Sequence, residues 1–299
     1  MSSKNDDLQN PNRKIALIAS CSGWGSGRAA AERGPIELLN AGLAESLNAM
    51  VVIVQAEPSM EGCSLPMEQV EKAIASHALK ISDAVVVAIE GGYLPVVIGG
   101  DHISAIGFHS GLARAHGETG IVWMDTHPDL NTPETSPSGN IHGMVLASLL
   151  GRGSETMLRA ANACQTKEKH VAMIGTRDID AGEQKWIDEG VITCMTMGYV
   201  NEHGLEESVH KAVEIANIAE AGFGLTIDLD VIDPSDAPFV ATPVEGGMKA
   251  TALIQALQST PSKDRLLGME VTEFTPRNEG DAALGAAIVS SLVTAITTL

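Results

Sequence analysis

The stretch that most constrains this chain is Asp125-Thr126-His127-Pro128-Asp129, which directly follows the apolar run 121–124. The apolar run is typical of a short buried strand. Alternate side chains of an extended backbone point the same way, so two carboxylates and an imidazole should converge where this strand ends. Carboxylates at the end of a buried strand repel one another and lose hydration, and a divalent cation converts that repulsion into ligation. The alternative is a solvated acidic turn with a chance histidine.

Two further apolar runs end in side chains of the same kind. Residues 96–100 lead to His102, and residues 225–227 lead to Asp228 and Asp230, which share one face of an extended chain. Ligands of parallel α/β sheets bind beyond the carboxyl ends of the strands, so three such ends favour one shared site. The predicted metal ligands are His102, Asp125, His127, Asp129, Asp228 and Asp230.

Strand-like and helix-like segments alternate along the whole chain. Short apolar runs lie at 14–20, 50–54, 96–100, 121–124, 171–175, 191–195, 223–229 and 266–271. Segments of helical spacing separate them, including a helix expected to have Pro35 in its first turn and to end near Ala49. The alternation predicts an α/β fold, a three-layer αβα sandwich with a central parallel sheet. We expect one domain over residues 13–299, preceded by a disordered polar tail over residues 1–12.

Composition excludes several classes of partner. The formal charge of −19 is unfavourable for binding nucleic acid or an anionic membrane surface, and it attracts a small cationic substrate. The segment 282–299 carries no charge, but it is rich in Ala, Ser and Thr, so a buried C-terminal helix is expected rather than a membrane span. The four cysteines are scattered and the first twelve residues lack the apolar stretch of a signal peptide, which predicts a cytoplasmic protein with reduced thiols.

Gly23, Gly25 and Gly27 alternate after the first predicted strand. The spacing is not that of a dinucleotide-binding loop, which needs G-x-G-x-x-G before a helix. We interpret the segment as a flexible loop at the edge of the sheet.

The candidate ligands themselves indicate the metal. Two imidazoles and four carboxylates are too many for one tetrahedral zinc, and oxygen and nitrogen donors without sulfur favour a harder ion such as manganese. Four carboxylates balance two divalent cations. Two metals about 3.5–4 Å apart can share a water molecule and lower its pKa toward neutrality. These residues therefore predict a hydrolytic site with a hydroxide nucleophile.

At this point the chain resembles the ureohydrolase family, which includes the arginases and agmatinases, and it is most similar to bacterial arginases. The likeness covers nearly the whole chain and is carried by Gly34-Pro35, Gly99-Gly100-Asp101-His102, Asp125-x-His127-x-Asp129, Ser138-Gly139-Asn140-x-His142-Gly143, Asp228-x-Asp230-x-x-Asp233-Pro234, Thr242-Pro243 and Glu273-x-x-Pro276. The resemblance implies an arginase-like fold and two Mn²⁺ per chain. It also implies hydrolysis of L-arginine to L-ornithine and urea by a metal-bridging hydroxide, in a homo-oligomer, either a trimer or a hexamer.

The resemblance also assigns roles to residues. His142 matches the proton shuttle, Glu273 the partner of the guanidinium group, and Asp129 a catalytic metal ligand. The positions that match substrate-binding residues are Asn131, Ser136, Ser138 and Asn140 in one loop, Asp180 facing the α-ammonium group with Glu183 nearby, and Thr242 beside Glu273. Each has a plainer alternative: Asp180 could cap a helix, Glu273 a turn, and His142 could be a solvated loop residue.

Several positions depart from the arginase pattern, namely Ile103, Thr126, Pro128, Ala241 and Phe274-Thr275-Pro276. Two alternative functions follow. The first is hydrolysis of another guanidino acid, such as N-hydroxyarginine or guanidinobutyrate. The second is a non-enzymatic arginine-binding protein on the same fold.

Overall fold

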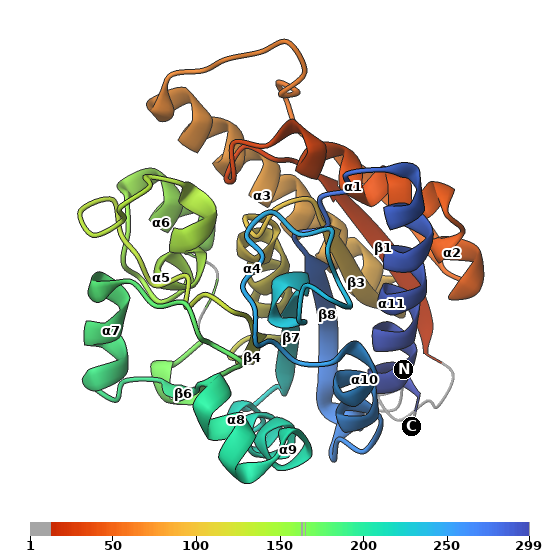
Figure 1. Ribbon diagram of the computed structural model, residues 1–299. Coiled ribbons are helices and arrows are strands. Elements are labelled where there is room, and N and C mark those ends of the chain that lie inside the picture. The colour runs from red at the N-terminus through yellow and green to blue at the C-terminus, as the bar shows by residue number, and fades with distance from the viewer. Residues whose placement is uncertain (1–12, 163, 165, 299) are drawn as a thin grey trace.

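A computed structural model describes residues 13–162, 164 and 166–298, so the tail predicted for residues 1–12 lies outside the described residues. Eight parallel strands form one sheet in the order β2-β1-β3-β8-β7-β4-β5-β6 (Figure 1). The strands are β1 (Lys14–Cys21), β2 (Met50–Gln55), β3 (Tyr93–Gly99), β4 (Gly120–Met124), β5 (Val171–Ile174), β6 (Thr193–Met195), β7 (Phe223–Asp228) and β8 (Leu266–Thr272).

Helices cover both faces of this sheet, which confirms the predicted layered α/β fold. On one face lie α3 (Met67–Glu90), α4 (Ser104–His116), α5 (Val145–Leu149) and α6 (Glu155–Ala161). On the other lie α1 (Ala29–Asn40), α2 (Leu43–Ser46), α9 (Leu205–Ala216), α10 (Ala250–Gln258) and α11 (Glu279–Thr297). The shorter α7 (Ala181–Asp188) and α8 (Met197–His203) flank β6.

The four strands β3, β8, β7 and β4 are consecutive in the sheet. β4, β7 and β8 are buried along their whole length, and β3 is buried from Leu94 onward. Burial on both faces explains why these strands are continuous apolar runs rather than alternating ones. Because they are parallel neighbours, their carboxyl ends meet at one edge, and residues that follow them in the sequence are brought together there.

Two local predictions differ from the structure. The helix expected to begin at Pro35 begins at Ala29, so Pro35 lies inside α1. It was also expected to continue to about Ala49, but it ends at Asn40, where Gly42 adopts a left-handed φ of 90° and starts the separate α2. The helix α8 was not predicted; the Thr196 side chain caps it by accepting from the Tyr199 N–H.

The apolar C-terminal segment forms α11, a helix of the core. It packs on α1, α10 and β8, and its side chains Val289, Leu292, Val293 and Ile296 are fully buried. By length and composition alone residues 280–297 could cross a membrane, but half of that stretch is buried inside the protein. The prediction of a core helix is confirmed.

One buried histidine on α3 makes stability depend on pH. His77 Nε2 lies 2.9 Å from Ser20 Oγ of β1, and burial lowers the pKa of His77 to about 4. The unfolded chain, with a histidine pKa of about 6.5, takes up the proton first. The stability due to neutral His77 is therefore present above pH 6.5 and is lost as the pH falls toward 4.

Between pH 7 and 5 we expect His77 to lower the free energy of unfolding by about 2 kcal/mol. Urea denaturation of wild type and His77→Gln at both pH values measures this; equal losses in the two proteins would contradict it.

Candidate metal centre and adjoining pocket

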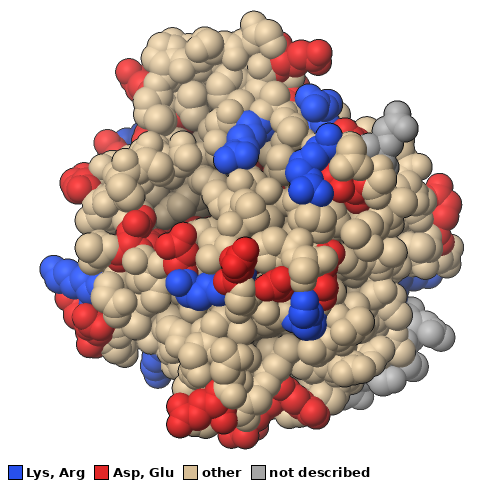
Figure 2. All heavy atoms as spheres, viewed as in Figure 1, with Lys and Arg blue, Asp and Glu red and all other residues tan. Residues whose placement is uncertain are grey.

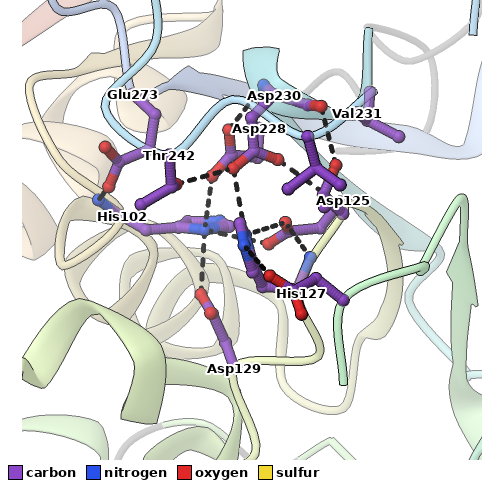
Figure 3. A network of polar contacts seen from close by, with 12 residues as sticks. His102, Asp125, His127, Asp129, Asp228, Asp230, Val231, Thr242 and Glu273 are labelled. Carbon is purple, nitrogen blue, oxygen red and sulfur yellow. Dashed lines mark hydrogen bonds and ion pairs between the residues drawn. The ribbon is translucent and has the colours of Figure 1, made fainter. Parts of the chain in front are cut away.

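The candidate site lies at the carboxyl ends of the four central strands (Figure 3). His102 follows β3, Asp125 follows β4, Asp228 ends β7, and Glu273 follows β8. These residues are far apart in sequence but adjacent in space, because the strands that carry them are neighbours. The structure therefore brings the three predicted ligand segments to one place.

A first cluster surrounds the imidazole of His102. Its Nδ1 lies 3.2 Å from Asp125 Oδ2, 3.0 Å from Asp129 Oδ2 and 3.3 Å from Asp228 Oδ2. The ring is stacked on Trp123 with centroids 4.3 Å apart, which fixes its orientation. One ring N–H can satisfy only one of three oxygens well. Three carboxylate oxygens and a nitrogen that converge in this way fit the coordination shell of a cation.

A second cluster surrounds His127. Its Nδ1 lies 3.0 Å from Asp230 Oδ2 and 3.7 Å from Asp125 Oδ1. Asp125 thus turns Oδ2 toward the first cluster and Oδ1 toward the second. Its orientation is held by Trp123 Nε1, which donates to Oδ2 at 3.0 Å, and by the His127 backbone N–H, which donates to Oδ1 at 2.7 Å. Two candidate cation sites share Asp125.

The electrostatics show why these carboxylates need positive charge. Burial, together with the charge of Asp125, raises the pKa of Asp129 to about 6 and also raises that of Asp230. Burial raises the pKa of Asp228 well above its usual range, with a further contribution from Asp230. Burial alone would also raise the pKa of Asp125, but hydrogen bonds from the two imidazoles hold it well below its usual range.

The residues present fit two divalent cations. Two imidazolium charges cannot balance four carboxylates, whereas two divalent cations can. Every donor is a carboxylate oxygen or an imidazole nitrogen, the combination suited to manganese. The first cation would be held by His102, Asp125, Asp129 and Asp228, and the second by Asp125, His127 and Asp230.

Two of the four non-glycine residues with positive φ in the described part of the chain lie beside this centre. Asp129 has a φ of +53° and Glu273 a φ of +64°, both in the left-handed region that costs a non-glycine residue about 1 kcal/mol or more. Both are candidate functional residues. Strain held at such positions is typical of sites where the surrounding fold dictates side-chain direction.

Glu273 connects the centre to a histidine in the loop that follows β4. Its Oε1 accepts from the His102 backbone N–H at 2.9 Å and lies 2.9 Å from His142 Nδ1. Its Oε2 is buried without a hydrogen-bond partner among the described residues. Burial by itself would lower the pKa of His142, but the charge and the hydrogen bond of Glu273 raise it to about 9. The pair therefore holds a proton beside a carboxylate that keeps one buried oxygen unpaired among the described residues.

A pocket of about 190 Å³ opens over the first cluster. All seven residues predicted to bind substrate line it, namely Asn131, Ser136, Ser138, Asn140, Asp180, Glu183 and Thr242. His142 also lines it. Figure 2 shows a hollow on the face drawn, with acidic side chains along its lower edge. The entrance is therefore electronegative, as a cationic ligand requires.

Two acidic residues of the pocket also stabilise the fold. Asp180 and Glu183 form a capping box at the start of α7, so the helix-cap alternative for Asp180 is present in the structure. Glu183 also accepts from the Leu130 N–H at 3.1 Å, and Asp180 accepts from Asn131 Nδ2 at 2.8 Å. These bonds fasten the loop after β4 to α7 and thereby shape the pocket.

One acidic lining residue of the pocket was not predicted, and one glycine-rich segment lies elsewhere than predicted. Asp178 lines the pocket with its Oδ2 3.6 Å from His127 Nε2; its alternation with Asp180 was the available signal. The segment with Gly23, Gly25 and Gly27 was expected to be a flexible loop at the sheet edge. It is instead buried from Ser22 to Ser26 and lies against the candidate site, because β1 is not an edge strand.

Comparisons with known proteins agree with this geometry. Residues 13–295 match the model of the arginase family. The chain is 34% identical to an arginase of Bacillus caldovelox over 94% of this chain and 98% of that protein. Its fold is similar to crystal structures of arginases from Bacillus subtilis (TM-score 0.83, 31% identity) and Entamoeba histolytica (TM-score 0.83, 26% identity). Both cover 94% of this chain and 98% of the other.

The shared position of Asp125 predicts an asymmetric effect of mutations on metal content. Asp125→Asn should reduce retained manganese below about one ion per chain, since it weakens both sites, whereas Asp129→Asn should leave about one. Elemental analysis after manganese loading and gel filtration measures both. Asp83→Asn, at an exposed carboxylate of α3 away from the clusters, is the control and should retain about two. An Asp125→Asn protein that keeps both ions would show that this carboxylate does not bridge.

Proposed function

Because the chain belongs to the arginase family, we propose that it hydrolyses the guanidino group of L-arginine to give L-ornithine and urea, with two Mn²⁺ per chain. The observation that carries the proposal is the buried Glu273, which contacts His102 and His142 of the acidic pocket through Oε1 and leaves Oε2 without a partner among the described residues, next to two clusters of cation ligands. When bound, the two cations supply an activated water molecule as the nucleophile. The chain's own residues perform the other tasks.

Glu273 would orient the guanidinium group. A guanidinium is planar and cationic, and a carboxylate is its natural partner. Since Oε1 of Glu273 is already engaged by His102 N and His142, Oε2 is the atom left to accept from the substrate. The fold holds this carboxylate by a strained backbone, so the direction of the bond is set before substrate arrives.

His142 would carry a proton to the leaving amine. Its pKa of about 9 means that it is protonated at neutral pH, and it lines the pocket with part of its ring exposed. General acid catalysis of this kind contributes typically about 10²–10⁴-fold. The contact with Glu273 keeps the proton donor next to the group that orients the guanidinium.

The other end of the pocket suits an α-amino acid. Ser136 Oγ accepts from the Gly139 N–H at 3.0 Å and Ser138 Oγ accepts from the Asn140 N–H at 3.2 Å. Both hydroxyl protons are thus left to donate to an α-carboxylate. Asp180 offers a carboxylate to an α-ammonium group. The Entamoeba histolytica arginase was crystallised with L-ornithine, an amino acid of this kind.

Thr242 and Asp129 complete the proposed machinery. Thr242 Oγ1 donates to Asp230 Oδ2 at 3.1 Å, so it links the pocket wall to the second cluster. Asp129 belongs to the first cluster, has the strained backbone itself and directly precedes the substrate loop, which places the metal centre and that loop on one continuous segment.

We also propose a cytoplasmic homo-oligomer, a trimer or hexamer, in which residues 13–299 form a single domain. Partners other than the small-molecule substrate, such as nucleic acid or membranes, are not expected from the charge of −19. Light scattering with size-exclusion chromatography measures the oligomeric state.

Urea release from L-arginine, with and without added manganese, tests the activity. His142→Ala should lower kcat about 10²–10⁴-fold with manganese content unchanged, because it removes the proton donor and no ligand. His210→Ala, at a histidine on α9, is the matched control and should keep wild-type activity. No urea from arginine in the manganese-loaded wild type would refute the proposed substrate. Release from another guanidino acid would then select the alternative hydrolase, and no release from any would select a binding protein.

A second measurement tests specificity for an α-amino acid. Asp180→Ser keeps a helix cap but removes the negative charge that faces the α-ammonium group. The variant should raise KM for arginine about tenfold and leave KM for guanidinobutyrate, which has no α-amino group, unchanged. Equal changes for both substrates would mean that Asp180 acts on the loop rather than on the substrate.

A further inference from the structure

The glycine loop, residues 22–28, joins β1 to α1 and lies folded against the candidate site. Ser26 Oγ donates to Gly23 O at 3.2 Å, which closes the loop on itself. The Trp24 ring donates through Nε1 to Pro58 O at 2.7 Å, which anchors its outer side. Neither the metal clusters nor the pocket lining includes a residue of this loop.

Asp101 anchors the loop through hydrogen bonds to its backbone. Its side chain is fully buried, and its Oδ2 accepts from the Ser26 N–H at 2.8 Å. The Gly25 N–H donates to the same carboxylate. A buried carboxylate that lost these donors would be left without solvation, so the two bonds hold the loop firmly in place.

Gly25 in turn holds His142. The Gly25 carbonyl accepts from the His142 backbone N–H at 3.3 Å, and His142 Nδ1 lies 2.9 Å from Glu273 Oε1. Hydrogen bonds therefore connect Asp101, Gly25, His142 and Glu273 in series. Four segments distant in sequence meet in this series, and the loop is the member that fixes the backbone of the histidine.

Only glycine fits at position 25. A Cβ there would lie 2.3 Å from Ile103 Cγ2 and 3.2 Å from the His142 backbone nitrogen. The φ of Gly25 is not in the left-handed region, so lack of space is what excludes a side chain. Any side chain must move the loop away from Ile103 and from His142.

We propose that the glycine loop is a positioning element for His142: it sets the place of the histidine backbone and thereby keeps the ring on Glu273 and directed at the pocket. The inference rests on the proposed function, because it gives the loop a part in the proton-transfer step of that reaction. Gly25 and Asp101 act through His142 and touch neither the substrate pocket nor the metal clusters.

The test is a double-mutant cycle of Gly25→Ala and His142→Ala in the manganese-loaded protein. Gly25→Ala should lower kcat about 10–100-fold, as displacement of a catalytic group by about 1 Å does, with KM for arginine and manganese content unchanged. In the His142→Ala background the same substitution should change kcat less than about twofold, because no positioned ring remains. Gly198→Ala in α8, where the nearest atom to the new Cβ is Thr196 Oγ1 at 3.5 Å, is the matched control and should leave kcat unchanged.

Gly25→Ala with wild-type kcat, or losses that multiply in the double variant, would overturn the inference while leaving the proposed function intact. An inactive wild type would overturn both. If Gly25→Ala does not fold, Asp101→Ala replaces it in the cycle, since it releases the Gly25 and Ser26 N–H groups without adding an atom. It should show the same loss of kcat and the same dependence on His142.

Discussion

Mutual repulsion among four buried aspartates is the constraint on which the rest of this structure depends. Asp125, Asp129, Asp228 and Asp230 are nearly inaccessible to water, and their oxygens converge on two imidazoles. Carboxylates gathered in this way are unfavourable unless cations or protons compensate them. Parallel neighbouring strands bring these side chains to one edge of the sheet, and their chemistry suits that edge to divalent cations.

Glu273 is the residue that, in the proposed function, connects this centre to a cationic substrate. It follows β8, between the strands that carry His102 and Asp228, so it lies beside the clusters without joining them. One carboxylate oxygen is engaged by the protein and the other is free. In the proposed function, this division lets one residue orient a guanidinium group and also keep a proton on His142, the two requirements for expelling an amine from a tetrahedral centre.

The loop after β4 shows how structural and binding roles combine in the same groups. Glu183 and Asp180 cap α7 and also bind the loop that carries the candidate substrate residues. The pocket is thus formed by a loop that is fastened at several points rather than by a mobile one. Rigid placement of polar groups lowers the entropic cost of orienting a small substrate.

The sequence by itself determined the layered fold, the strand ends and the identity of the side chains gathered there. The alternation of side chains along a strand is a local property, and the parallel topology follows from the order of the elements. Only the tertiary structure decided that Asp125 faces both clusters, that Glu273 keeps one oxygen free, and that the glycine loop is buried against His142. These features depend on contacts between distant segments: Ser26 and Asp101 are 75 positions apart, and His142 and Glu273 are 131 apart. No periodicity within either segment encodes such contacts, since they arise only when the sheet has placed the segments side by side.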